Sequence, residues 1–504
     1  MSDADAGIEL DSPTGRTVLA TVVLGSAVAS LTATVVNVAL PALASDLDAG
    51  SSEQKWIING YTLTLAAFIL IGGSFGDRFG RLKMYRVGVV WFAVASLLCA
   101  VAWDTRSLIG FRLLQGVGGA LLTPGSLAII ESSLRRSDRG RGVGAWSGIT
   151  GLAGAIGPLL GGLLVDISWR WVFVINIPVA VAVIILSRWV PETRDPGARD
   201  SSLDFGGAAL SVVVLGAVSY AFIEGPEGGF SSVEVATVLV AVLGAGLLWW
   251  TERRRDHPML PLDLFTNRTF AVANVLTFVI YGGMGVLFFL LSVQLQVTAG
   301  WSALKAGSAL VPVTVIMLLL SSRAGDLSQR IGPRWPLTIG PIVMAVGMAM
   351  MTRIGPDASY ATDVLPAVTV FGFGLAGIVA PVTTTALGSV PDERAGAASG
   401  ANNAVARTGG LLAVAAIPGL VGLTGDALSE PRLLDPGFGR SMWVSAAIVA
   451  FGGVLALLLL RSDDLDDAAS DSGPTPGNEP GAHCHPCPVD GQLTTIPHSA
   501  TPTG

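Results

Sequence analysis

The chain has 504 residues, of which 51% are hydrophobic and 13% are charged, and its formal net charge is −7. A soluble domain carries roughly a quarter charged residues, so this composition excludes an ordinary soluble protein and indicates a polytopic membrane protein. The net acidity argues against a nucleic-acid partner, and three cysteines are too few for a disulfide framework.

Apolar windows with short breaks follow one another along the chain, and each is long enough to cross a hydrocarbon core of about 30 Å as a helix. The acidic start of the chain is unlike a signal peptide, so we expect the first window to stay as a span. Two broad windows, 269–293 and 361–387, have room for a kink or a re-entrant piece. The sequence thus predicts fourteen spans, at about 17–40, 55–76, 85–103, 107–130, 142–165, 171–190, 205–223, 233–250, 269–293, 304–322, 335–352, 361–387, 398–423 and 441–460.

The Lys and Arg residues are distributed unevenly over the loops. If the N-terminus is cytoplasmic, the cytoplasmic segments hold about three times as many as the opposite side, which is the usual bias of membrane proteins. We therefore expect both termini in the cytoplasm.

A short loop of glycines and charges joins the second and third windows. Its glycines allow close approach of the backbone, and its charges must stay at the water interface because burying each one in lipid costs about 3 kcal/mol or more. The residues that define the loop are Gly73, Gly76, Asp77, Arg78, Gly80, Arg81 and Lys83.

This loop resembles the hallmark loop of the major facilitator superfamily, and the resemblance implies a gating role for its residues, Asp77 among them. Further segments resemble the fourteen-span drug:proton antiporter branch of that family: Asn37–Pro41, Arg112–Gly116, Gly157–Gly162, Trp169–Pro178, Gln296–Ser302 and Asn402–Gly410. The resemblance covers about residues 17–460. It implies an all-α membrane protein with two six-helix bundles around a central cavity and two accessory spans between them.

The domain boundaries follow from an internal echo, because residues 323–334 repeat the Arg-x-Gly step of the first loop, again followed closely by a second arginine. We expect an N-terminal bundle at 17–200, accessory spans at 201–260 and a C-terminal bundle at 261–460. Residues 1–16 and 461–504 are expected to be cytoplasmic, the latter as a disordered tail rich in Asp, Ser, Gly and Pro.

Two arginines fall inside spans, where a charge is costly unless it faces a polar cavity or a partner. The resemblance implies a role for Arg112 in proton transfer; alternatively, it only binds carbonyls of neighbouring helices. Arg407 is closer to a cytoplasmic end, where it can reach the interface, so a structural role is equally open for it.

The fifth span carries Gly144, Gly157, Pro158, Gly161 and Gly162, which resemble the antiporter motif and imply export. Glycines allow helices to pack closely and a proline allows a helix to kink, so we expect this span to make a close contact between the two bundles. The alternative is generic small-residue packing. Other residues expected to line the substrate cavity are polar or aromatic side chains within spans: Thr32, Asn37, Asn59, Tyr61, Gln296, Asn402 and Arg407.

An acidic residue that is usual in the first span of this branch is missing. The branch usually has an aspartate in the first span that is thought to bind the coupling proton, and Thr32 stands there. Since a hydroxyl does not titrate near neutrality, coupling is expected either to move to an acid at the end of a span, Asp77 near Arg112, or to be weak or absent.

The tail contains His483-Cys484-His485-Pro486-Cys487, a pattern that can bind zinc or copper. A single short cluster without a folded surrounding is more often unselected tail sequence, so we expect no metal and no cofactor.

The function implied by the family is export of small amphiphilic or cationic compounds across the plasma membrane by a monomeric, non-enzymatic antiporter that exchanges substrate for protons. The chain has no ATP-binding Gly-x-x-x-x-Gly-Lys-Ser/Thr loop, so an ion gradient would supply the energy. An uncoupled or lipid-type facilitator is one alternative, and a membrane sensor or scaffold is another.

Overall fold

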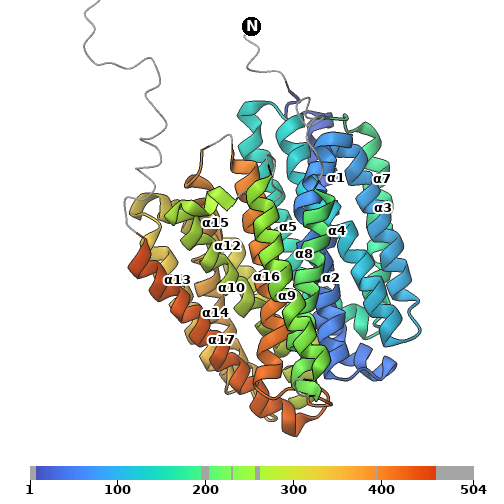
Figure 1. Ribbon diagram of the computed structural model, residues 1–504, viewed down its shortest axis with the longest axis vertical. Helices are drawn as coiled ribbons and strands as arrows, with labels where there is room; N and C mark the ends of the chain where they lie inside the picture. Colours follow the sequence, from blue (N-terminus) through green and yellow to red (C-terminus); the bar gives the residue numbers. More distant parts are fainter. Residues whose placement is uncertain (1–6, 195–203, 229–230, 256–261, 392–393, 461–504) are drawn as a thin grey trace, which may run out of the picture.

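The protein is a bundle of long helices (Figure 1). The computed structural model describes residues 7–194, 204–228, 231–255, 262–391 and 394–460. Within these ranges fourteen helical segments are long and apolar enough to span a membrane, which confirms the predicted spans. The only β pairing in the described residues is an isolated bridge between Ile8 and Leu134.

The N-terminal half comprises the helices up to residue 189. Its spans are α1 (Pro13–Leu47), α2 (Ser51–Phe79), α3 (Arg81–Ala100), α4 (Thr105–Ser133), α5 (Arg136–Val165), and the segmented sixth span α6 (Trp171–Val174), α7 (Asn176–Leu186) and η2 (Ser187–Trp189).

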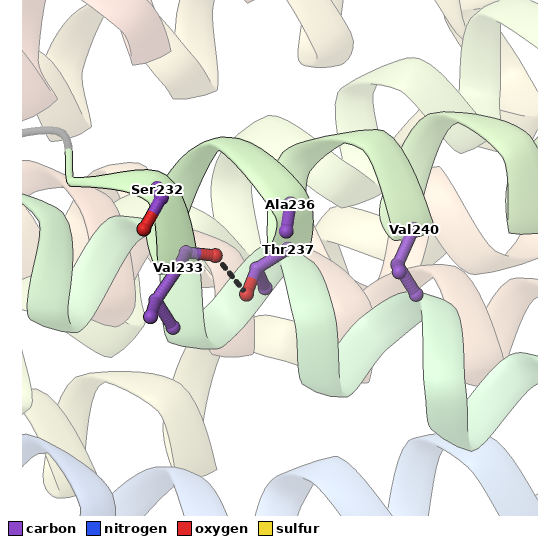
Figure 2. Close-up of a pocket in the computed structure, with 5 residues that line it drawn as sticks. All are labelled: Ser232, Val233, Ala236, Thr237 and Val240. Carbon is purple, nitrogen blue, oxygen red and sulfur yellow. Dashed lines mark hydrogen bonds between the residues drawn. The ribbon is translucent and has the colours of Figure 1, made fainter.

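A hairpin of α8 (Phe205–Gly228) and α9 (Ser232–Arg254) follows, and we call it the accessory hairpin. Its helix α8 packs against α2 and α16, one from each half, and α9 packs on α8 (Figure 1). One face of α9 carries a shallow depression lined by Ser232, Val233, Ala236, Thr237 and Val240 (Figure 2). Since the Thr237 hydroxyl already donates to the Val233 carbonyl at 2.8 Å, we interpret this apolar face as a lipid-facing surface.

The C-terminal half contains the remaining spans. They are α10 (Arg268–Val293) with η5 (Gln294–Thr298), α11 (Ala303–Ser308) with α12 (Val311–Ile331), α13 (Arg334–Met351), η6 (Tyr360–Val364) with α14 (Leu365–Ala376) and α15 (Val379–Gly388), α16 (Ala395–Leu420) and α17 (Pro431–Leu459); the short turn η4 (Leu262–Thr266) precedes them. The break between α14 and α15 is a kink inside the broad window 361–387.

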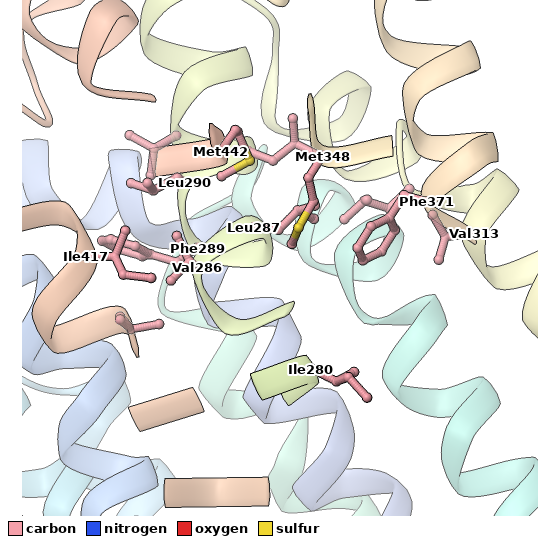
Figure 3. Packing of buried hydrophobic residues seen from close by; sticks show 14 of the residues in the cluster. Ile280, Val286, Leu287, Phe289, Leu290, Val313, Met348, Phe371, Ile417 and Met442 are labelled. Carbon is pink, nitrogen blue, oxygen red and sulfur yellow. The ribbon is translucent and has the colours of Figure 1, made fainter. Parts of the chain in front are cut away.

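Helix pairing repeats between the halves. The first span packs on the fifth and the third on the fourth; correspondingly α10 packs on α16 and α13 on α14. Glycines make these contacts close: a Cβ added at Gly118 of α4 would clash with the Phe92 backbone of α3, and one at Gly409 of α16 with the Phe278 carbonyl of α10. Side chains of α10, α12, α13, α14, α16 and α17, among them Leu287 and Met348, fill the core of the C-terminal half (Figure 3).

The two ends of the bundle are distinguished by their loops. Gly80 joins α2 to α3 at one end, which we call the loop-80 end, and the first described helix begins there. Ala49 and Gly50 join α1 to α2 at the opposite, loop-50 end. Because fourteen spans separate the start of α1 from the end of α17, both lie at the loop-80 end.

Candidate functional site

Arg112 lies about two turns from the start of α4 and is 1% exposed. Its Nε donates to the Ile57 carbonyl of α2 at 3.0 Å, its Nη1 donates to Gln115 Oε1, and its guanidinium lies 4.6 Å from the Tyr61 ring centroid. A cation in this apolar interior needs such partners because desolvation is costly. Arg112 therefore holds α2 against α4 and at the same time anchors a polar network.

The network extends from Arg112 to the first span. Gln115 Nε2 donates to Ser96 Oγ of α3 at 2.8 Å, and Asn176 Nδ2 of α7 donates to the same oxygen at 3.1 Å. Thr32 Oγ1 then donates to Asn176 Oδ1 at 3.1 Å. Thr32 and Arg112 are thus the two ends of one buried chain of hydrogen bonds, which we call the Arg112 network.

The Arg112 network is electrically unbalanced. Within the described residues its hydrogen-bond partners are hydroxyl, amide and carbonyl groups, and no carboxylate pairs with Arg112. Thr32 is fully buried at the far end, where the resemblance places an aspartate. The arrangement can relay a change in hydrogen bonding across four helices, but it lacks an acid of its own.

Sequence reasoning identified the two ends of this network and missed its middle. Gln115 follows Arg112 by three residues, so helical spacing alone could have linked them. Ser96 and Asn176 come from α3 and α7, and only tertiary packing brings them together.

Arg407 lies half-buried on α16. Since α16 contacts α2, this second intramembrane arginine belongs to a helix at the contact between the two halves.

The hallmark loop is built around Gly80, whose φ of +112° is a conformation that side chains rarely adopt. Beyond it, the backbone N–H groups of Leu82 and Lys83 each donate at 3.0 Å to Glu192, a carboxylate from the segment after the sixth span. Glu192 thus caps the start of α3, and no local pattern in the sequence points to this role.

Asp77 at the end of α2 pairs with Arg81 at the start of α3, and the two charged atoms are 2.8 Å apart. Ile57, which binds Arg112, and Asp77 are twenty residues apart on α2, which corresponds to about 30 Å along the helix. The structure therefore does not bring Asp77 near the Arg112 network. Of the other loop residues, Arg78 stacks on Phe79, Gly73 lies beside Pro124, and Lys83 is exposed.

The glycines of α5 fall into two groups. Gly157 and Gly161 pack against Thr34 and Val35 of α1, whereas a Cβ added at Gly162 would lie 2.5 Å from Leu304 Cα in the other half. Pro158 presents its carbonyl to Gly307, also in the other half. A Cβ at Gly144 would meet open space.

The remaining residues that were expected to line the substrate cavity make separate contacts in different parts of the structure. Asn402 donates to Asn274 and Thr277 inside the C-terminal half, and Gln296 donates across the halves to the Val38 carbonyl at 3.0 Å. Asn37 leaves its Oδ1 without a partner, and Asn59 leaves both amide atoms without one, although both residues are buried.

The halves are joined by hydrogen bonds at the loop-50 end. Ser51 N donates to the Gly425 carbonyl at 2.9 Å, and Leu428 N donates to Ser51 Oγ at 3.1 Å. The Gln296 contact lies at the same end. This end of the interface between the halves is closed.

At the loop-80 end, Arg394 forms an ion pair of 2.5 Å with Asp263, next to the start of α16. Its hydrogen bond holds the pKa of the Asp263 carboxyl below its ordinary value.

The His483–Cys487 segment lies outside the described residues, and the described ranges contain no cluster of three potential metal ligands.

Comparison with known proteins gives consistent results. A family model described as the Major Facilitator Superfamily matches residues 22–414. Multidrug resistance protein Stp of Mycobacterium tuberculosis is 34% identical over 83% of this chain and 78% of its own length. The methylenomycin A resistance protein of Bacillus subtilis is 34% identical over 90% of this chain and 96% of its own length.

Among solved structures, a bacterial homologue of the human lysosomal transporter Spinster, in an inward-facing and unoccupied conformation, superposes with a TM-score of 0.62 at 16% identity. The match covers 91% of this chain and 99% of that one. At this identity the likeness is one of fold.

Proposed function

Because the chain belongs to the major facilitator superfamily, we propose that it exports small drug-like compounds, amphiphilic or cationic, by alternating access. It is a multi-pass membrane transporter and not an enzyme. The observation that carries the proposal is the identity of about a third, over most of both chains, with proteins named for multidrug and antibiotic resistance.

We place the loop-80 end in the cytoplasm of the cell and the loop-50 end outside, across the plasma membrane. The excess of Lys and Arg in the segments at the loop-80 end supports this orientation. The hydrogen bonds that close the loop-50 end then correspond to an outer gate that is shut, as in an inward-facing state.

The Arg112 network supports a role in conformational coupling rather than a complete proton site. It connects α1, α2, α3, α4 and α7 through buried hydrogen bonds, yet its α1 end is Thr32. We propose that proton coupling, where present, depends less on the first span than in the family's usual pattern. Uncoupled movement of the substrate is the second candidate, and the Thr32 hydroxyl favours it.

The test is substrate flux in inside-out membrane vesicles that contain the full chain. We expect substrate to accumulate in the vesicles, with Arg112→Gln abolishing accumulation. Binding of substrate without accumulation in the parent would identify a sensor instead, and accumulation that stops at equal concentrations would identify a facilitator.

A further inference from the structure

Lys55 is a fully buried cation at the loop-50 end of α2. Its Nζ lies 3.3 Å from Glu227 Oε1 of α8 and 3.4 Å from the carbonyl oxygen of Leu423, which follows α16. A buried ammonium group needs a counter-charge, because removing water from an unpaired ion is costly. Glu227 supplies that charge from the accessory hairpin.

Glu227 also binds the opposite half of the protein. Its Oε2 accepts the backbone N–H of Gly425 at 2.5 Å. One carboxylate thus contacts α2 of the N-terminal half and the 421–430 segment of the C-terminal half. Its side chain is 20% exposed, so it is the member of the pair that solvent reaches.

A second acid, one turn earlier on α8, strengthens the attachment to α2. Glu224 Oε1 accepts from Ser52 Oγ at 2.6 Å and from Trp56 Nε1 at 2.8 Å. Its two partners both belong to the N-terminal half. The accessory hairpin is therefore fixed to α2 by Glu224 and reaches the C-terminal half through Glu227.

Two buried polar side chains, one on α2 and one on α8, lack hydrogen-bond partners. Asn59, one turn along α2 from Lys55, is buried with both amide atoms unpartnered, and the Ser219 hydroxyl of α8 is buried without a partner. Each unsatisfied group of this kind destabilises the closed arrangement.

We propose that Glu227 of the accessory hairpin is the latch of the outer gate. It neutralises buried Lys55 and holds the Gly425 N–H group, and the halves cannot separate at the loop-50 end while all three remain together. The accessory hairpin then controls the inward-to-outward equilibrium without touching the substrate. This inference rests on the proposed alternating access.

The test measures how often the outer gate opens. Leu428 is 1% exposed at the contact between the halves, so Leu428→Cys reports opening when a membrane-impermeant maleimide is added outside intact cells. Cys99, Cys484 and Cys487 are replaced by serine to remove the background. Glu227→Gln is expected to accelerate labelling about ten-fold, which corresponds to about 1.4 kcal/mol.

Two variants separate a latch from a general loss of structure. Glu227→Asp keeps the carboxylate and is expected to label at close to the parent rate. Glu234→Gln removes another acid of the same hairpin, whose carboxylate caps α9 through Ser231, and is expected to leave labelling unchanged. Equal acceleration by Glu227→Gln and Glu234→Gln would overturn the proposal, as would no acceleration by Glu227→Gln.

If Glu227→Gln does not reach the membrane, Lys55→Met decides the question, because it removes the buried cation instead of leaving it unpaired. Faster labelling in Lys55→Met supports the latch, and labelling at the parent rate refutes it. Export by the unlabelled parent is measured separately in vesicles. Failure of the parent to export refutes the proposed function, whereas failure of the labelling pattern in an exporting parent refutes only the latch.

Discussion

Replacing Thr32 by aspartate should strengthen the dependence of transport on the proton gradient. In its protonated form the introduced carboxyl group can donate to Asn176 Oδ1, as the Thr32 hydroxyl does now at 3.1 Å. The ionised form has no donor and requires the Asn176 amide to turn, which sacrifices its hydrogen bond to Ser96 at a cost of about 1 kcal/mol. The uncompensated charge of Arg112 at the other end of the network offsets part of this cost. Both forms are therefore accessible, as proton coupling requires.

The expected magnitude follows from the proton gradient. One pH unit across the membrane corresponds to about 1.4 kcal/mol per proton, or about a ten-fold accumulation ratio for each proton exchanged. In proteoliposomes with the membrane potential clamped, we expect a monocationic fluorescent substrate to accumulate about ten-fold more per pH unit in Thr32→Asp than in the parent. Thr32→Asn is the matched control, because it has nearly the shape of aspartate and cannot titrate.

The interpretation of Thr32 is wrong if the parent already accumulates the substrate with the same pH slope as Thr32→Asp. It is also wrong if Thr32→Asn gains the same slope, since the effect would then be one of shape. A parent that equilibrates the substrate without accumulating it would support uncoupled movement.

Three further predictions concern other parts of the chain. Gly162→Ala, which must displace the Leu304 backbone, should slow flux about ten-fold, whereas Gly144→Ala meets open space and should not; similar initial rates in the two variants would contradict this packing argument. Asp77→Asn should abolish transport but leave the yield of folded protein unchanged, because a partly exposed ion pair with Arg81 contributes at most about 1 kcal/mol; near-normal flux would count against a gating role. Deleting residues 465–504 should leave flux intact because the segment is polar, and lost activity or stoichiometric zinc binding by the isolated peptide would indicate a metal-regulated tail.

Apolar length was enough to predict where the membrane-spanning helices lie, because a backbone in lipid must satisfy its own hydrogen bonds. Each predicted window corresponds to a helical span. The width of the two broad windows allowed a kink in both; the window 361–387 has one, whereas the window 269–293 is the continuous helix α10. Helical spacing also relates Arg112 to Gln115.

Partners that are distant in the sequence could not be predicted in this way. The Lys55–Glu227 pair is separated by 172 positions and joins a bundle helix to the accessory hairpin, so no periodicity connects the two residues. Ser96 and Asn176 each look like ordinary polar residues in an apolar span, and their role depends on how α3 and α7 are rotated. The prediction that Asp77 lies near Arg112 is wrong for a related reason. Asp77 and the Arg112 partner Ile57 belong to the same helix, α2, but lie near its opposite ends.

The position of α8 between α2 and α16 makes the protein asymmetric toward the surrounding lipid. The halves meet along two seams, one between α2 and α16 and one where α5 contacts α11 and α12. The main described contacts of the accessory hairpin with the halves are to α2 and α16, so it covers the first seam and leaves the second to the bilayer (Figure 1). A lipophilic molecule that arrives sideways from the membrane therefore meets a shielded flank on one side and an unshielded flank, bordered by the glycines of α5, on the other.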